Sequence, residues 1–245
     1  EMLRLYKTGV SSNDVAVSVG RDPRCVRFNI AKLGAMRSRT EAVRLAAQNG
    51  KIRAPNRSVR HDVFDELSTS KAWVLGLIAG DGHVCNRQDK GHYRVEMLGT
   101  ESVLRKAAAI VGYEEAPRAY MGTWKIVWSS RAMVMALKER FGWAGAKART
   151  LRLPDLPDDL LSHFVRGLWD ADGAWRVKGR HVRPQLLCAS SGLIEDHRRL
   201  FGGCVSHGTT ILRGKEYAYH TIGFRIAEAL KFAAWVYRGS DDSIR

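Results

Sequence analysis

The chain has 245 residues, enough for one large domain or two modest ones, and its 45% hydrophobic and 27% charged residues are ordinary for a globular protein. Its 40 Lys and Arg against 25 Asp and Glu give a net charge of +15, which predicts a polyanionic partner. No apolar run reaches the ~18 residues of a membrane span, and the N-terminus lacks a signal segment, so nucleic acid is favoured over a membrane surface.

Four scattered cysteines show neither a C-x-x-C pair nor a histidine cluster at zinc spacing. They are Cys25, Cys85, Cys188 and Cys204. This usage predicts free thiols in the reducing compartment of a cell, cytoplasm or nucleoid. The chain begins at Glu1 without Met and stops at Arg245 in a charged stretch, so we expect trimmed ends.

Residues 1–36 predict three short helices, each ended by a glycine. Asp22-Pro23 opens the third helix, because proline is favoured in a first helical turn. The exposed side of this helix carries Arg24, Arg27, Asn29 and Lys32. Three short helices with a basic last one resemble a helix-turn-helix unit, whose recognition helix enters the DNA major groove. A helical cap with solvated charges is the alternative.

Residues 37–70 lose clear periodicity and predict an extended basic linker. From Arg21 to Arg60, eleven Lys and Arg stand against two acids, a net charge of +9. Such arms often follow phosphates or lie in the minor groove. We therefore expect DNA contacts from Arg37, Arg39, Arg53 and Arg57. A solvated tether is the alternative, although its charge would still strengthen binding without sequence preference.

Residues 71–157 and 158–245 predict two copies of one helix–strand–strand–helix plan, of α+β class. The first copy would hold a motif helix at 71–81, a polar hairpin, strands at 92–98 and 124–128, and helices at 102–112 and 131–141. The second would hold a motif helix at 160–172, strands at 181–188 and 217–222, and helices at 193–201 and 226–237. Apolar and polar residues alternate in the first strand of each copy, so each sheet should bury one face against helices.

The remaining polar face of each sheet would be free to contact a ligand. Arg and Gln side chains can make bidentate contacts to guanine and adenine edges. The candidates for base reading are Arg94, Glu96, Lys125, Arg183, Gln185, Tyr217 and Tyr219.

Each motif helix ends in Asp-Gly and carries small residues one turn apart. The first reads Val-Leu-Gly-Leu-Ile-Ala-Gly-Asp-Gly over 74–82, and the second Val-Arg-Gly-Leu-Trp-Asp-Ala-Asp-Gly over 165–173. Small residues four apart share one helix face and let two helix backbones approach closely. They are Gly76 and Gly80 in the first copy, and Gly167 and Ala171 in the second. We expect the two motif helices to pack against each other.

That packing would place Asp81 and Asp172 at the same end of one helix pair. Two like charges there are unfavourable unless cations neutralise them. Oxygen ligands favour Mg²⁺ or a similar ion, which keeps waters and also binds phosphate oxygens. A helix that merely ends in Asp-Gly would explain one copy, but two matched copies favour a metal site.

The two motifs resemble those of single-chain LAGLIDADG homing endonucleases, and the resemblance covers residues 71–245. The basic segment 145–154 resembles the connector that leads into the second motif helix. The resemblance implies a saddle of two four-stranded antiparallel sheets over the DNA and a double-strand cut with short 3′ overhangs. Ala79 replaces the first acid of the first motif, whereas Asp170 keeps it in the second; that position is not a metal ligand.

The resemblance also implies the roles of individual residues. The metal would be held by Asp81, Asp172 and the backbone carbonyls of Gly80 and Ala171. Lys147 would stabilise negative charge that develops during the reaction. Mg²⁺ is the expected cofactor, and Mn²⁺ or Ca²⁺ could substitute for binding.

The sequence thus predicts a site-specific, metal-dependent DNA endonuclease that cuts both strands of a long target as a monomer with internal pseudo-two-fold symmetry. Because the two copies differ, the target should be asymmetric. A transcriptional regulator that has lost cleavage and an RNA-binding intron maturase are the alternatives. The presence of both acids favours the nuclease, and the helix-turn-helix favours duplex DNA. An intein-embedded enzyme is disfavoured, since no splicing module appears.

Overall fold

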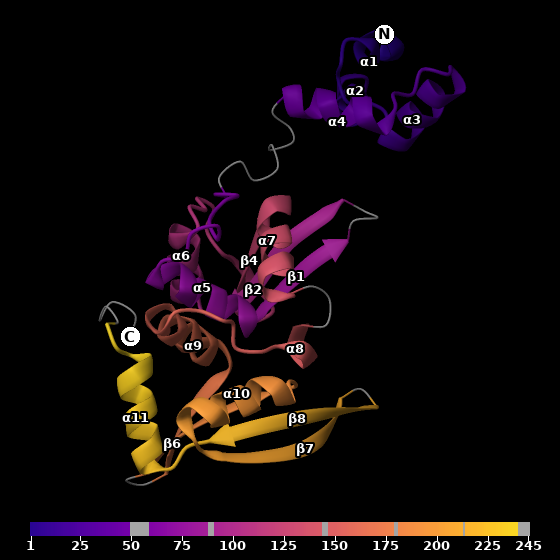
Figure 1. The fold of residues 1–245 in the computed structure, drawn as a ribbon. Coiled ribbons are helices and arrows are strands. Elements are labelled where there is room, and N and C mark those ends of the chain that lie inside the picture. Colours follow the sequence, from indigo (N-terminus) through magenta and orange to yellow (C-terminus); the bar gives the residue numbers. More distant parts are fainter. Residues whose placement is uncertain (50–58, 88–90, 144–146, 179–180, 213, 240–245) are drawn as a thin grey trace. The chain divides into compact units, whose positions relative to one another are not determined.

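The computed structural model describes residues 1–49, 59–87, 91–143, 147–178, 181–212 and 214–239. The chain divides into two compact units, residues 1–57 and 58–245. Figure 1 shows helices in the first unit and two sheets with helices in the second. None of the described helices is long and apolar enough to cross a membrane. Arg53 and Arg57, which we expected to contact DNA, lie outside the described residues.

The first unit is helical. Its helices are α1 (Met2–Lys7), α2 (Ser12–Ser18), α3 (Pro23–Lys32) and α4 (Arg39–Gln48). The third begins as predicted, because the Asp22 side chain accepts a hydrogen bond from the backbone N–H of Arg24 and Pro23 fills the first turn. The unit has a small apolar core of its own, made by Tyr6, Val15, Ala16, Val26 and Ile30.

The segment 37–70 differs from the extended linker that we predicted. Arg39–Gln48 forms helix α4, and Leu45 on this helix approaches Gly9 in the first unit. Near the other end, three apolar residues are buried in the core of the second unit: Val59, Val63 and Phe64. The apolar residues of this segment are few and lie among basic ones. They therefore form no periodic pattern from which their burial could have been predicted.

The second unit contains both repeats. The first repeat consists of α5 (Thr69–Ala79), β1 (Gly82–Arg87), β2 (His92–Gly99), α6 (Glu101–Ile110), β3 (Arg118–Tyr120), β4 (Thr123–Ser129) and α7 (Arg131–Phe141). The short helix α8 (Lys147–Thr150) precedes the second repeat. That repeat consists of α9 (Asp158–Asp172), β5 (Gly173–Lys178), β6 (His181–Cys188), α10 (Ser191–Phe201), β7 (Cys204–Leu212), β8 (Lys215–Gly223) and α11 (Ile226–Val236).

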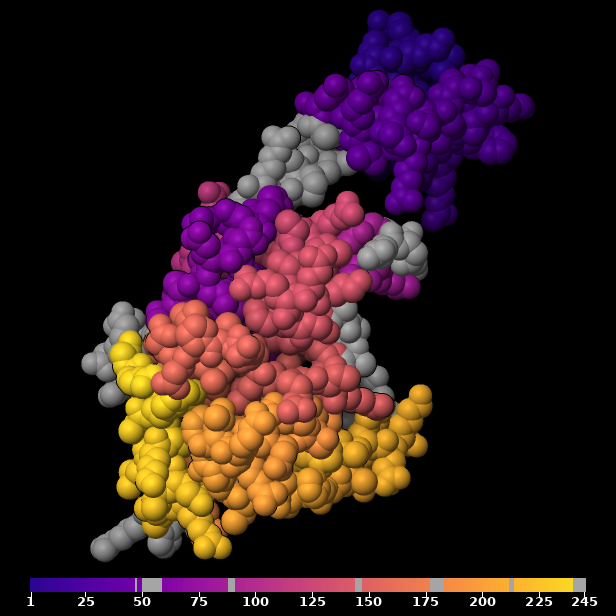
Figure 2. Space-filling view, viewed as in Figure 1, coloured from indigo at the N-terminus to yellow at the C-terminus, as the bar shows by residue number. Residues whose placement is uncertain are grey.

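Each repeat forms one four-stranded antiparallel sheet, with strand orders β1-β2-β4-β3 and β5-β6-β8-β7. The α+β class, with two antiparallel sheets backed by helices, is therefore confirmed. The strand alternation is also as predicted: Val95 and Met97 of β2 are buried, while Arg94 is exposed. Figure 2 shows the two repeats meeting along a continuous surface, from α7 through α9 to α10.

Sequence patterns showed only two of the four strands in each repeat. The third strand, β3, has three residues, all exposed, which is too short for a periodic signal. The first strand of each repeat begins at the glycine that ends a motif helix, so its start is hidden inside the motif. The β7 strand carries polar residues on both faces over most of its length.

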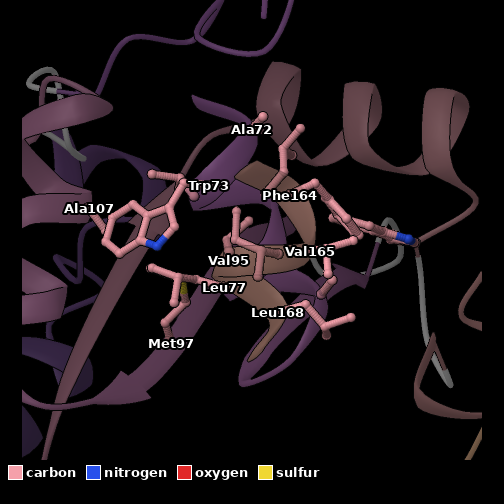
Figure 3. Packing of buried hydrophobic residues seen from close by; sticks show 14 of the residues in the cluster. Ala72, Trp73, Leu77, Val95, Met97, Ala107, Phe164, Val165 and Leu168 are labelled. Atoms are coloured by element: carbon pink, nitrogen blue, oxygen red, sulfur yellow. The ribbon is translucent and has the colours of Figure 1, made fainter. Parts of the chain in front are cut away.

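Side chains from both repeats form one core around the motif helices. Figure 3 shows Trp73 and Leu77 of α5 packed with residues of β2, α6 and α9. The partners labelled there are Val95, Met97, Ala107, Phe164, Val165 and Leu168. All of them are buried, so the repeats do not separate without exposing this core to water.

Candidate metal and nucleic-acid site

The two motif helices, α5 and α9, pack with their backbones in direct contact. A Cβ atom on Gly76 would lie 2.0 Å from the carbonyl oxygen of Phe164, and one on Gly167 would lie 2.0 Å from that of Trp73. Neither distance is possible for a real Cβ, so only glycine allows this approach. The small residues one turn apart therefore do what we predicted for them.

The contact between α5 and α9, which we call the seam, brings the two motif acids together at the ends of these helices. A Cβ on Gly80 would lie 2.6 Å from the Ala171 Cβ and 3.1 Å from Oδ2 of Asp172. The carboxylate of Asp172 thus lies against the residue that precedes Asp81. The seam therefore places a carboxylate from each repeat in the same small region.

The surroundings of the two acids raise the pKa of each. Burial, together with the neighbouring charge of Asp81, raises the pKa of Asp172 to about 6, while Lys147 acts in the opposite direction. Burial also raises the pKa of Asp81, again opposed by Lys147. A cation that binds beside these two carboxylates favours their ionised forms.

Lys147 lies close to both acids. Its side chain is buried, and Nζ donates to the carbonyl oxygens of Ala79 at 2.6 Å and Gly80 at 3.1 Å. Burial lowers the pKa of Lys147 to about 8, while the charges of Asp172 and Asp81 oppose this shift. The ammonium group thus satisfies carbonyls at the C-terminal end of α5, where a positive charge is favourable.

The donor atoms at the seam fit a hard divalent cation. Within the described residues, no group of three or more His, Cys, Asp or Glu could hold a metal. A cation here would have two carboxylates, nearby backbone carbonyls, and water or phosphate oxygens as ligands. Mg²⁺ tolerates such a set, because it commonly uses one or two carboxylates and keeps several waters.

Asp170 plays a different part from Asp172, although only one residue separates them. Its Oδ2 accepts a hydrogen bond from Nε1 of Trp73 at 2.8 Å, which links α9 to α5 across the seam. Ala79 occupies the matching place in the first motif and is buried.

A cavity of about 440 Å³ lies beside the acids, and its lining includes Asp81, Asp170 and Ala171.

The open face of the first sheet carries a charged cluster formed by three of the predicted residues. Glu96 accepts ion pairs from Arg94 at 2.7 Å and from Lys125 at 2.6 Å. The side chains are partly exposed, with 46% for Arg94, 26% for Lys125 and 17% for Glu96. The acid is therefore the least accessible member, and the two cations flank it at the surface.

The open face of the second sheet is more basic. Arg176 of β5 stands opposite Arg183 of β6, and Gln185 stands opposite Gly223 of β8. A cavity of about 710 Å³ opens here and is lined by Arg176, Arg183, Gln185 and Arg225 among others. Tyr217 and Tyr219 lie further along β8 on the same face, opposite Thr210 and Gly208.

Sequence patterns missed Arg176 and Arg225 in this set. Arg176 follows the second motif by three residues, and continuing the period-2 pattern from Ala174 would have found it. Arg225 occupies the N-cap of α11, where no strand pattern applies, so only the fold brings it to the cavity.

In the first unit, α3 exposes most of the predicted basic side. Arg24, Arg27 and Lys32 are exposed, as is Arg39 at the start of α4. The side-chain amide of Asn29 donates to the backbone carbonyl of Cys25 at 2.9 Å and is only partly accessible.

Arg37 differs from our expectation of a DNA contact. Its guanidinium lies over the Tyr6 ring, 3.9 Å from the centroid, and donates to the carbonyl of Val10 at 3.2 Å. Such stacking and hydrogen bonding stabilise the first unit internally. A basic residue in an irregular segment gave no sign of this role in the sequence.

Two antiparallel sheets joined through a pair of glycine-containing motif helices define the LAGLIDADG fold. Among solved structures, the chain is similar to the homing endonuclease I-DmoI in complex with DNA and Ca, with a TM-score of 0.51 and 15% identity over 70% of this chain and 91% of that one. The homing endonuclease I-WcaI bound to its DNA recognition sequence gives 0.48 and 12%, covering 77% and 91%. The N-terminal LAGLIDADG domain of DUF199/WhiA gives 0.42 and 14%, covering 79% and 96%.

The comparison of sequences adds one relative. A DNA polymerase of Thermococcus hydrothermalis is 24% identical over 197 residues, which cover 73% of this chain but 12% of the polymerase. The chain thus spans about an eighth of the length of that protein. No family model matches the sequence. At these identities the likeness to solved structures shows the fold.

Proposed function

We propose that this chain is a site-specific, metal-dependent endonuclease that cuts both strands of duplex DNA. The observation that carries the proposal is the convergence of Asp81 and Asp172 from two repeats, with Lys147 buried beside them. A paired-acid site of this kind favours phosphodiester chemistry, because a cation held by carboxylates also binds phosphate oxygens.

Each residue of the site would have a separate task. Asp81 and Asp172, with the carbonyls of Gly80 and Ala171, would hold Mg²⁺. The ion would supply Lewis-acid stabilisation of the phosphate and a more acidic bound water. Lys147 would hold the end of α5 in place and supply positive charge where negative charge develops. I-DmoI has been crystallised with DNA and Mn and with DNA and Ca, so Mn²⁺ and Ca²⁺ are reasonable probes of the same site.

The open faces of the two sheets would lie over the DNA in a saddle. The first offers a Glu flanked by two cations, and the second offers arginines, a glutamine and two tyrosines. Since the faces differ, the two half-sites should differ, and the target should be asymmetric. The exposed basic side of α3 would extend the contact as a helix-turn-helix. One chain holds both repeats, which favours a monomer.

A cleavage selection tests this proposal. The full chain with Mg²⁺ is incubated with a library of randomised duplex DNA, and the cut ends are sequenced. We expect one asymmetric sequence to be enriched, with both strands cut. Asp81→Asn and Asp172→Asn should abolish cutting and keep binding, whereas Asp62→Asn, an exposed acid outside the site, should cut normally.

Other outcomes point to other functions. Tight binding of a DNA sequence without cutting by the unchanged chain would favour a transcriptional regulator on the same fold. Preferential binding of structured RNA over duplex DNA would favour an intron maturase. Either result would contradict the endonuclease.

A further inference from the structure

Two histidines face each other across β7 and β8 in the second sheet. His207 and His220 are directly opposed in the strand register, and their Nδ1 atoms lie 2.7 Å apart. The ring centroids are 4.9 Å apart and the ring planes are 75° from parallel. At this separation one Nδ1 donates its hydrogen and the other accepts it. Two imidazole nitrogens therefore already converge on one point.

The pair lies on the helix-facing side of the sheet, past the edge of the core. Val205 and Ile222 are two residues away on the same strands, so they share this face. Ile222 is fully buried, whereas the histidine pair is open to solvent. Tyr217 and Tyr219 are on the opposite face. The pair is thus separate from the surface for which we propose DNA contacts.

Cys188 of β6 is opposite His220 in the register and is the next residue of this cross-strand row. Its Sγ donates to the carbonyl of Ser190 at 3.2 Å, and burial raises the pKa of the thiol to about 11. Because this thiol is engaged with the Ser190 carbonyl and holds its proton more tightly than a free cysteine, it is a poorer ligand here than the two imidazoles. The available ligands at this place are the two imidazoles.

We propose that His207 and His220 chelate a divalent transition-metal ion, with Zn²⁺, Ni²⁺ and Cu²⁺ as the fitting class. Imidazole suits these ions, whereas Mg²⁺ prefers oxygen ligands, so this site differs chemically from the carboxylate site. Two nitrogens at ~2.0–2.1 Å from one tetrahedral Zn²⁺ are about 3.4 Å apart. Small side-chain rotations open the pair that far; the donor ring changes tautomer, its proton passing through solvent from Nδ1 to Nε2 of the same ring, and water completes the coordination.

A metal ion held by this pair links two neighbouring strands. β7 and β8 form a long ribbon of nine residues each. A cross-link between its strands stabilises the ribbon because an ion that binds only the folded state shifts the equilibrium toward it. This consequence is independent of nuclease activity and of the acids on the motif helices.

An NMR titration of the full chain with Zn²⁺, in excess Mg²⁺, tests the proposal. Mg²⁺ occupies carboxylate sites and leaves imidazole sites free. We expect the ring signals of His207 and His220 to shift together, before those of other histidines, and to saturate at one equivalent of Zn²⁺. His207→Asn or His220→Asn should weaken this binding by about tenfold or more, because one imidazole loses the advantage of chelation. His92→Asn, an exposed histidine on β2, is the matched control and should bind like the unchanged chain.

Two results would overturn the proposal. One is a Zn²⁺ titration in which the two ring signals stay fixed while others shift. The other is an unchanged Zn²⁺ affinity in both asparagine variants. The thermal midpoint without metal shows whether each variant folds; if neither does, the ring signals of the unchanged chain decide the question alone.

Discussion

Lys147 shows how much the role of a single residue depends on its surroundings. In the sequence it is one basic residue in a basic connector, and the LAGLIDADG resemblance alone suggested a catalytic part. In the structure it is buried, and Nζ holds the carbonyls of Ala79 and Gly80 directly before Asp81. A buried cation beside two carboxylates stabilises their ionised forms, and so also favours a site ready for metal.

Replacement of Lys147 by Met should therefore slow DNA cleavage without weakening DNA binding. We expect cleavage to slow by about 10²–10³-fold, the usual effect of removing a charge-stabilising group. Binding measured in Ca²⁺ should change little, since Lys147 is only 7% exposed and we expect most DNA contacts from the open faces of the sheets. Lys138→Met, an exposed lysine on α7, is the control. Cleavage at the normal rate by a folded Lys147→Met chain would contradict the proposed role.

A second prediction for a single residue concerns His197 and the pH dependence of the free energy of unfolding. Its Nε2 accepts from the indole N–H of Trp169 at 3.2 Å, and its Nδ1 bonds the carbonyl of Leu193 at 2.8 Å. The bond from Trp169 suits only the neutral ring, because a protonated Nε2 cannot accept a hydrogen bond, whereas the Nδ1–H bond to Leu193 is possible in either form. Burial lowers the pKa of His197 from 6.5 to about 4.

Between these two pH values the unfolded chain binds more protons than the folded one at His197. Its contribution is thus fully present above pH 6.5 and is lost as the pH falls toward 4, up to about 3 kcal/mol. Urea unfolding at several pH values measures this loss. His197→Gln should be less stable at pH 7 but lose less between pH 6.5 and 4, while His92→Gln should follow the unchanged chain. Equal slopes for all three chains would refute the assignment to His197.

At the scale of elements, the seam between α5 and α9 decides the geometry of the site. Gly76 and Gly167 allow backbone contact, and Trp73 bonds Asp170 across the same seam. These contacts therefore fix the position of α5 along the axis of α9. This fixed position is what places Asp81 and Asp172 together.

Gly76→Ala should destabilise the fold by about 3 kcal/mol, because its methyl group would overlap the backbone of α9, which cannot yield as a flexible side chain can. Urea unfolding measures this change. Gly99→Ala is the matched control: its Cβ would meet Leu104 at an ordinary 3.7 Å, so its cost should be small. A Gly76→Ala chain as stable as the control would mean that the seam opens easily.

At the scale of the whole molecule, the boundary between the units falls at residue 57 and not at 70. Val59, Val63 and Phe64 belong to the core of the second unit, and Arg140 donates to the carbonyl of Phe64. A chain that starts at 71 would therefore lose core side chains as well as the helical unit.

Removal of residues 1–57 should leave the second unit folded, with a similar Tm, whereas removal of 1–70 should lower its Tm clearly. Each buried large apolar side chain that is lost costs about 2–5 kcal/mol. With the shorter deletion, DNA affinity should fall and its dependence on salt should weaken, since fewer phosphates are contacted. If affinity falls equally for all sequences, the first unit adds affinity alone; a changed target sequence would show that it reads bases.

The sequence by itself determined the doubled motif, the alternation of β2 and β6, and the basic helix α3, because each of these is a local pattern of a few neighbouring residues. It did not show the edge strands β1, β3, β5 and β7, the burial of Val59 to Phe64, or the internal role of Arg37. Those depend on partners distant in the chain. The closeness of Asp81 to Asp172, the buried position of Lys147 and the facing histidines were likewise decided by tertiary structure, since only packing brings residues of different repeats or strands within bonding distance.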